Sequence, residues 1–316
     1  MKSQTIQSAF AGLSYPAVPK KLLKQFHELL TVHAGAKTRS NGKSPETLIV
    51  PHIDFRVNLD LYAKAYARLL RLKKFPDTFY ILGVGHNCPH EFSACRCDYL
   101  TPLGSVLSDD GILESIQDHC GFKISRAPVS FRREHSIEYV VIWLQAIRDL
   151  FFPEQNFQIV PILMGGLMDS MQSGSLPEKG HEITRFGEAV ARAIAEQASG
   201  KSALIASIDG CHVGPRFGHP FAALSPVQHA VEKWEDELWR LCRSDCLDQF
   251  VLHLAALQNC FYFDGTGVLA LLLRNFQMKA VRMSQHLWYE GRDQSFVSFS
   301  AGYFEPLRTK RENSKN

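Results

Sequence analysis

Long apolar runs are absent from this 316-residue sequence. No stretch approaches the roughly 20 apolar residues that a membrane-spanning helix needs. The opening residues Met1–Gln7 lack the continuous apolar segment of a secretory signal. We therefore expect a cytoplasmic protein without a membrane partner.

A surplus of charge of one sign is also missing, because the formal net charge is only +3. Binding to nucleic acids or anionic membranes usually requires a basic stripe or cluster. The one dense basic run lies in the polar C-terminal tail, where solvation explains it most simply, and it comprises Arg308, Lys310, Arg311 and Lys315. These features argue against a nucleic-acid partner.

Cysteine is present at eight positions, but without the paired spacing of a structural zinc site. The only close pairs are Cys95 with Cys97 and Cys242 with Cys246. In a cytosolic protein such cysteines are more often reduced core residues than parts of a disulfide framework. A Cys-x-x-x-Cys-x-x-Cys motif is missing as well, so radical chemistry on an iron–sulfur cluster is not expected in this chain.

Apolar residues make up 45% of the chain, enough for a large core. Short apolar runs alternate with helical patterns, which is typical of an α/β fold whose mainly parallel or mixed sheet is flanked by helices. The expected strands are Leu48–Ile53, Phe79–Val84, Phe157–Leu163, Ala203–Ile208 and Phe296–Ser300. The expected helices are Leu59–Leu72, Gly111–Cys120, His135–Phe151, Ile183–Gln197, Gln228–Leu241 and Gly267–Phe276.

Two segments rich in Ser, Gly, Lys and Pro, Thr38–Glu46 and Met168–Gly180, are expected to be surface loops. Strands on either side of these loops would belong to one sheet. We therefore predict a single domain over residues 1–316, with its motifs at about 10–303 and a polar tail at 304–316.

Histidines follow three of the expected strands, at His52, His86 and His212. Functional groups of an open α/β sheet gather beyond the carboxyl ends of its strands. One such histidine is more often an ordinary loop residue, but three in equivalent places favour a shared site. Asp209 lies in the same segment as His212 and joins the candidates.

Two expected helix starts add further candidates. Glu134 precedes the helix that begins at His135, and a helix cap is a good explanation for it. A cap does not explain His135, because a cation is disfavoured there and a neutral imidazole supporting a site fits better. Asp264 can also be a cap, although its aromatic neighbours would desolvate the carboxylate unless a cation pairs with it.

Together these motifs resemble the Memo family, which includes the prokaryotic AmmeMemoRadiSam system protein B. The resemblance runs in order along nearly the whole chain, and the EHSIE motif is its most specific part. The matching motifs are Ala11–Pro16, Pro51–His52, Gly85–His86, Glu134–Glu138, Asp209–His212 and Ser295–Gly302.

The resemblance implies the fold of class III extradiol dioxygenases, which are non-haem iron enzymes, with a metal ion in the cleft. In a human member of the family two histidines and a cysteine bind the metal, and they correspond here to His52, His86 and Asp264. A carboxylate thus replaces the thiolate, unless Cys260 supplies sulfur. Two histidines and one carboxylate would leave open positions on Fe(II), with copper and zinc as alternatives.

By the same resemblance, His212 would be a general acid or base, and Asp209 would orient it or support it from behind. Glu134 and His135 would brace the metal ligands. The implied function is a dioxygenase-like oxidoreductase acting on a small aromatic or anionic molecule, with a radical SAM enzyme and an AMMECR-type protein as partners. The alternative is a non-catalytic module that binds a peptide or protein in the same cleft.

Overall fold

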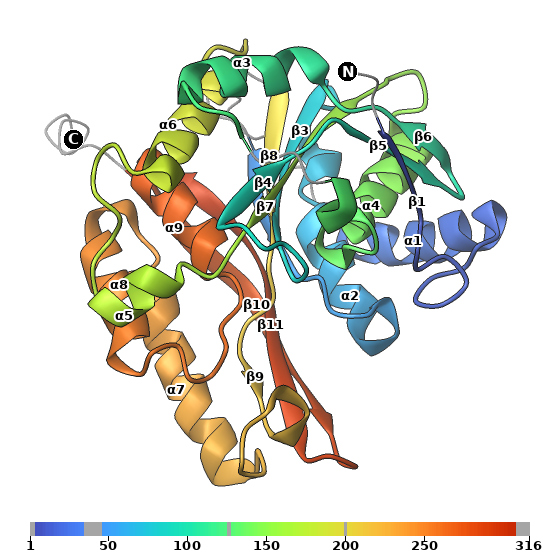
Figure 1. Cartoon of the computed structure of the whole chain (residues 1–316). Helices are drawn as coiled ribbons and strands as arrows, with labels where there is room; N and C mark the ends of the chain where they lie inside the picture. The colour runs from blue at the N-terminus through green and yellow to red at the C-terminus, as the bar shows by residue number, and fades with distance from the viewer. Residues whose placement is uncertain (1–3, 35–45, 125–127, 199–200, 308–316) are drawn as a thin grey trace, which may run out of the picture.

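The computed structural model describes residues 4–34, 46–124, 128–198 and 201–307. Its main sheet has the strand order β10-β11-β2-β8-β3-β7-β4, with β9 paired to β11 (Figure 1). The bounds are β2 Glu46–Val50, β3 Thr78–Val84, β4 Phe92–Ala94, β7 Gln158–Met164, β8 Ser202–Ser207, β9 His212–Val213, β10 Met278–Glu290 and β11 Ser295–Pro306. Strands β2, β8, β3 and β7 are parallel and the others pair antiparallel, which confirms a mixed α/β sheet.

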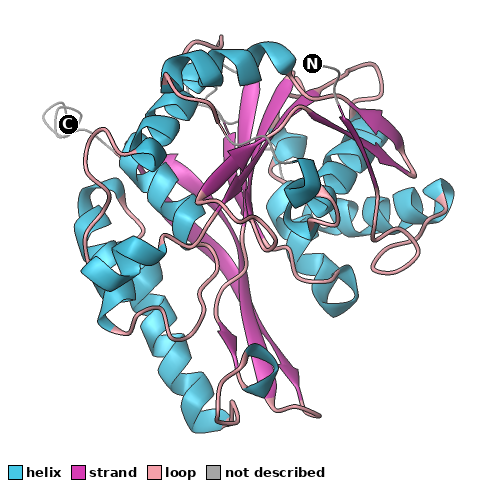
Figure 2. Cartoon of the chain, viewed as in Figure 1, coloured by secondary structure: helices cyan, strands magenta, loops and turns pink. Residues whose placement is uncertain are grey.

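Helices cover both faces of this sheet (Figure 2). On one face lie α1 (Pro19–His33), α2 (Phe55–Tyr66) and α4 (His135–Phe151). On the other lie α3 (Asp110–Cys120), α6 (Glu182–Ala195), α7 (Ser225–Leu241), α8 (Leu247–Ala256) and α9 (Thr266–Asn275). A small sheet of β1 (Gln4–Gln7), β5 (Cys97–Thr101) and β6 (Gly104–Val106) and a short α5 (Met168–Ser173) complete the fold.

Strand β3 shows why the central strands are continuously apolar. Phe79 and Ile81 enter the core beside α4, whereas Tyr80 and Leu82 enter the core beside α6. Successive side chains of a strand point to opposite faces, so a strand covered on both faces needs apolar residues at every position.

Several predicted boundaries were wrong. The helix predicted at Leu59–Leu72 begins at Phe55 and ends at Tyr66, and a separate 3₁₀ turn follows at Leu69–Arg71. The loop predicted at Met168–Gly180 contains α5. Residues 38–45 of the other predicted loop and residues 308–316 of the predicted tail lie outside the described residues.

The expectation of reduced cysteines was wrong for one pair, because the structure joins Cys95 and Cys97 in a disulfide. Cys120, Cys211 and Cys242 are free and buried, as expected of core residues. In the part of the chain that the structure describes, the helices lack the combination of length and apolar character that crossing a membrane requires.

Candidate metal centre

The centre is built where three parallel strands end at the same edge of the sheet. His52, His86 and Asp209 each lie two residues beyond a strand, after β2, β3 and β8. Because β2 and β3 both pair in parallel with β8, these equivalent positions lie side by side. Of the three histidines predicted to converge, His52 and His86 lie at this edge directly after their strands, whereas His212 lies in β9.

His52 is at the middle of the centre, with 1% of its surface exposed. Its ring Nδ1 lies 3.2 Å from the carbonyl oxygen of Ser207. Its Nε2 lies 3.0 Å from Oδ2 of Asp264 and 3.7 Å from Oδ2 of Asp209. His52 Nε2 and Asp264 Oδ2 are both buried, and neither has a hydrogen-bond partner among the described residues, although they are close enough for an ion pair. A ring nitrogen and a carboxylate oxygen, both suitable metal ligands, therefore face one another.

The rings of His52, His86 and His135 form a compact imidazole cluster. The ring centroid of His52 lies 5.0 Å from that of His86 and 5.0 Å from that of His135, nearly perpendicular to both. The rings of His86 and His135 stack with centroids 4.4 Å apart. One ring nitrogen of each residue lies within 4.8 Å of the other two. His135, predicted only to brace the ligands, thus stands beside them as a possible ligand.

The carboxylate of Glu134 holds His86, one member of this cluster, in position. This buried carboxylate accepts hydrogen bonds from the Ser136 backbone N–H (3.1 Å) and the His86 backbone N–H (3.1 Å), and lies 2.9 Å from His86 Nδ1. It therefore caps α4 and orients His86 at the same time. The cap explanation and the bracing role predicted for Glu134 both fit this geometry.

Gly83 lets α4 approach β3 closely enough for these contacts. A Cβ at this position would lie 2.5 Å from the Ser136 hydroxyl oxygen and 2.8 Å from Cδ1 of Ile137. Both residues belong to the first turn of α4, whose bounds are His135 and Phe151. The absence of a side chain at Gly83 therefore allows the first turn of α4, which includes His135, to pack closely against β3.

Burial and neighbouring charges shift the ionisation of the centre. Burial opposes a charged His52, but the carboxylates of Asp209 and Asp264 outweigh it and raise the pKa of His52 to about 10. Burial and the charges of neighbouring histidines lower the pKa of His135 to about 2, so its ring is neutral. Burial raises the pKa of Asp209. Burial also opposes ionisation of Asp264, but the charge of His52 outweighs it and lowers the pKa of Asp264.

Two groups of three side chains in the described residues could hold a metal ion. One is His52 with His86 and His135, and the other is His52 with Asp209 and Asp264. The predicted set of His52, His86 and Asp264 is divided between these groups, which share His52. Asp264, rather than the exposed Cys260, reaches His52, so a carboxylate stands where the resemblance implied a thiolate.

Asp209 was predicted to orient His212 or to support it from behind. In the structure its carboxylate accepts the backbone N–H groups of His52 (2.8 Å) and Ile53 (3.2 Å). Nδ1 of His212 lies 3.2 Å from the Gly210 carbonyl oxygen and 3.3 Å from the Tyr262 carbonyl oxygen. Carbonyls accept hydrogen bonds only, so Nδ1 carries a proton, and Nε2 is the ring nitrogen that could accept one.

Comparison with known proteins places the chain in a family. The model of the Memo-like protein family matches residues 7–303. A MEMO1 family protein of Aquifex aeolicus is 31% identical over 310 residues, which cover 94% of this chain and 72% of the relative. A MEMO1 family protein of Thermus thermophilus is 27% identical over 264 residues, covering 83% of this chain and 71% of the relative.

Proposed function

Because this chain belongs to the Memo-like protein family, we propose that its histidine centre binds a metal ion, with Fe(II) as the first candidate. The proposed activity is a dioxygenase-like oxidation of a small aromatic or anionic molecule. A radical SAM enzyme and an AMMECR-type protein are the proposed partners.

One observation carries the proposal: His52 Nε2 and Asp264 Oδ2 are buried and 3.0 Å apart, and neither has a hydrogen-bond partner among the described residues. Two ligand atoms that each lie about 2.0–2.2 Å from one ion, roughly at right angles, are about 3 Å from each other. The donors are a nitrogen and a carboxylate oxygen, and His86 supplies a second nitrogen nearby. Two histidines and one carboxylate are the ligand set of non-haem Fe(II) oxygenases.

When bound, the ion would supply open coordination positions for a substrate oxygen and for dioxygen. The residues of this chain have separate tasks. Ser207 and Glu134 orient the rings of His52 and His86 through Nδ1. His212 would accept a proton from the substrate at Nε2. Asp209 fixes the backbone of His52 and Ile53, so His52 stays at the strand end.

The test is the metal content of protein purified anaerobically from iron-supplemented cells. We expect near-stoichiometric iron in the wild type and its loss in His52→Ala and Asp264→Ala. The exposed His229 on α7 offers a matched control, because His229→Ala removes an imidazole that belongs to neither group of candidate ligands. Circular dichroism of each variant checks that it is folded.

Oxygen uptake during a screen of phenolic and anionic compounds then tests the reaction itself. A folded wild-type protein that takes up no iron, copper or zinc would overturn the metal centre. That result would favour the peptide-binding alternative for the same residues.

A further inference from the structure

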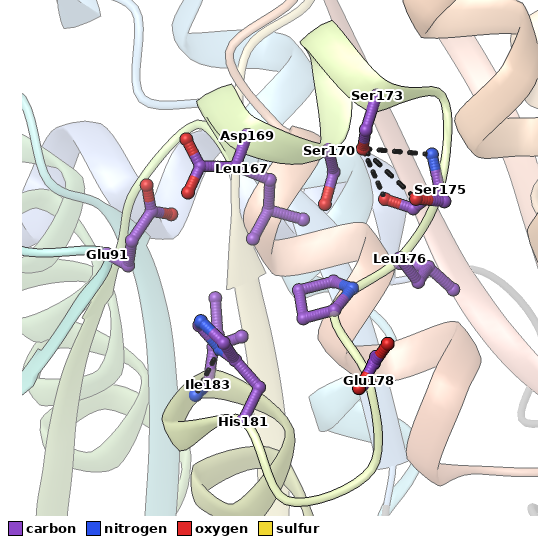
Figure 3. Close-up of a pocket in the computed structure, with 11 residues that line it drawn as sticks. Glu91, Leu167, Asp169, Ser170, Ser173, Ser175, Leu176, Glu178, His181 and Ile183 are labelled. Atoms are coloured by element: carbon purple, nitrogen blue, oxygen red, sulfur yellow. Dashed lines mark hydrogen bonds between the residues drawn. The ribbon is translucent and has the colours of Figure 1, made fainter.

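A second feature of the structure, separate from the histidine centre, is a cavity of about 250 Å³ beside α5 (Figure 3). Its lining comes from Glu91 before β4, from α5, and from the segment that leads into α6. The cavity is large enough for a short aliphatic molecule.

The polar lining of the cavity is acidic. Glu91, Asp169 and Glu178 contribute carboxylates, and neither lysine nor arginine is among the lining residues. Within the described residues, none of these carboxylates has a hydrogen bond or an ion pair. His181 adds no positive charge when neutral, and its Nδ1 accepts the Ile183 backbone N–H at 3.4 Å. The cavity therefore favours a cation.

Ser170 is an independent sign of a ligand. Only 2% of this residue is exposed, yet its hydroxyl makes no hydrogen bond with the described residues, and Figure 3 shows it directed into the cavity. Its oxygen can accept a hydrogen bond from an ammonium group.

The arrangement of the carboxylates suggests two positive charges on the ligand. In Figure 3, Glu91 and Asp169 point toward one another at one side of the cavity, and Glu178 lies at the other side. The apolar side chains of Leu176 and Ile183 also line the cavity. An aliphatic chain with an ammonium group at each end would match both acidic sides and the apolar lining.

A metal ion matches this cavity less well. In the described part of the chain, the groups of three close acidic, histidine or cysteine ligands lie at the histidine centre and not here. Apolar walls provide no ligand atoms for a metal ion, whereas they bury the methylene groups of an organic cation.

We propose that this cavity binds a short aliphatic diamine. One ammonium group lies between Glu91 and Asp169, and the other lies at Glu178. The Ser170 hydroxyl accepts a hydrogen bond from the ligand, and the alkyl chain covers Leu176 and Ile183.

Isothermal titration of the full chain with 1,5-diaminopentane tests this proposal, with 1,5-pentanediol as the neutral analogue. We expect saturable binding of one diamine and no detectable binding of the diol. Asp169→Asn and Glu91→Gln should each weaken binding about two- to fivefold, and the double variant about tenfold, as expected for partly solvated ion pairs.

Two control variants separate this cavity from other sites. Asp248→Asn removes an exposed carboxylate of α8 and should leave diamine affinity unchanged. His52→Ala should also leave it unchanged, so failure of the metal centre and failure of this site are distinguishable. Absence of saturable binding, equal binding of the diol, or an affinity that the Asp169 and Glu91 variants do not alter would each overturn the proposal.

Discussion

The side chain of Glu134 contacts both the start of helix α4 and His86. Its carboxylate caps α4 through the Ser136 N–H and holds both the backbone and the ring of His86. Glutamine keeps the size of the side chain and one acceptor oxygen, but it cannot accept from all of these donors at once. The cap can therefore survive a substitution that releases His86.

For Glu134→Gln we expect metal affinity to fall by about 10- to 100-fold, as is typical when a residue that orients a ligand is changed. Competition titration with a metallochromic chelator measures the affinity. Glu188→Gln is the control, since it makes the same change at an exposed position of α6. An unchanged affinity in a folded Glu134→Gln protein would mean that His86 does not depend on this carboxylate for its position.

The positions of the site residues could be predicted because each follows a strand or precedes a helix. Which of these side chains face one another could not be predicted. Whether His52 faces His86 or Asp264 depends on ring orientation, which the Ser207 carbonyl sets from β8. The role of Asp209 also depends on contacts across 157 residues, where the carboxylate meets the His52 N–H. Sequence patterns describe local structure and contain no information on such pairings.

At the scale of elements, the contact between β3 and α4 is unusually close at Gly83. Alanine there would place its Cβ 2.5 Å from the Ser136 hydroxyl oxygen. We expect Gly83→Ala to lower the free energy of unfolding by about 1–3 kcal/mol, the usual cost of overpacking. It should also displace the first turn of α4, and with it Glu134 and His135.

Urea denaturation measures this effect. Gly111→Ala is the matched control, because a Cβ at that position in α3 has its nearest neighbour at 3.7 Å, an ordinary contact. This control should be neutral or stabilising by up to about 1 kcal/mol, since alanine favours helix over glycine. If Gly83→Ala and Gly111→Ala have the same free energy of unfolding, helix α4 can move away from β3 without loss of stability.

Some helices and strands were predicted from the sequence and others were missed. Helix α4 was predicted at its observed bounds, because a buried helix with a capping Glu134 has a clear start. Helix α1 and strand β10 were missed. Strand β10 is half-buried along most of its length and lies at the sheet edge, where it pairs with β11 and, in the described residues, has one further bridge from Lys279 to Arg243. It therefore lacks a strong apolar alternation. Its structure depends on the hairpin with β11 rather than on its own pattern.

At the scale of the whole molecule, buried carboxylates make stability depend on pH. Burial raises the pKa of Glu235, which joins α7 to β11 through the Ser298 hydroxyl at 2.5 Å. Because the pKa of Glu235 is higher in the folded chain than in the unfolded chain, protonation of Glu235 stabilises the fold. This contribution to stability is fully present below the unfolded pKa of about 4.5. It is lost as pH rises through the folded value. Burial raises the pKa of Glu138 too, so a second group acts in the same direction.

Glu235→Gln keeps a neutral side chain at every pH. We therefore expect the unfolding free energy of wild type relative to this variant to decrease as pH rises above about 4.5. Urea denaturation between pH 4 and pH 8 measures the difference, with Glu188→Gln as the control for loss of one exposed carboxylate. A difference that stays constant over this range would show that Glu235 titrates alike in the folded and unfolded chain.

The proposed metal ion would join segments that lie far apart in the chain, because His52 and His86 follow strands β2 and β3 whereas Asp264 precedes helix α9. An ion bound only to the folded state stabilises it by about 2.7 kcal/mol at 100 times its dissociation constant. For a chain of this length that corresponds to an increase of about 4 °C in Tm. We expect this increase when Fe(II) is added anaerobically to chelator-treated protein in a thermal melt. His52→Ala should show no increase, because His52 belongs to both groups of candidate ligands. An equal increase in His52→Ala would place the ion elsewhere in the molecule.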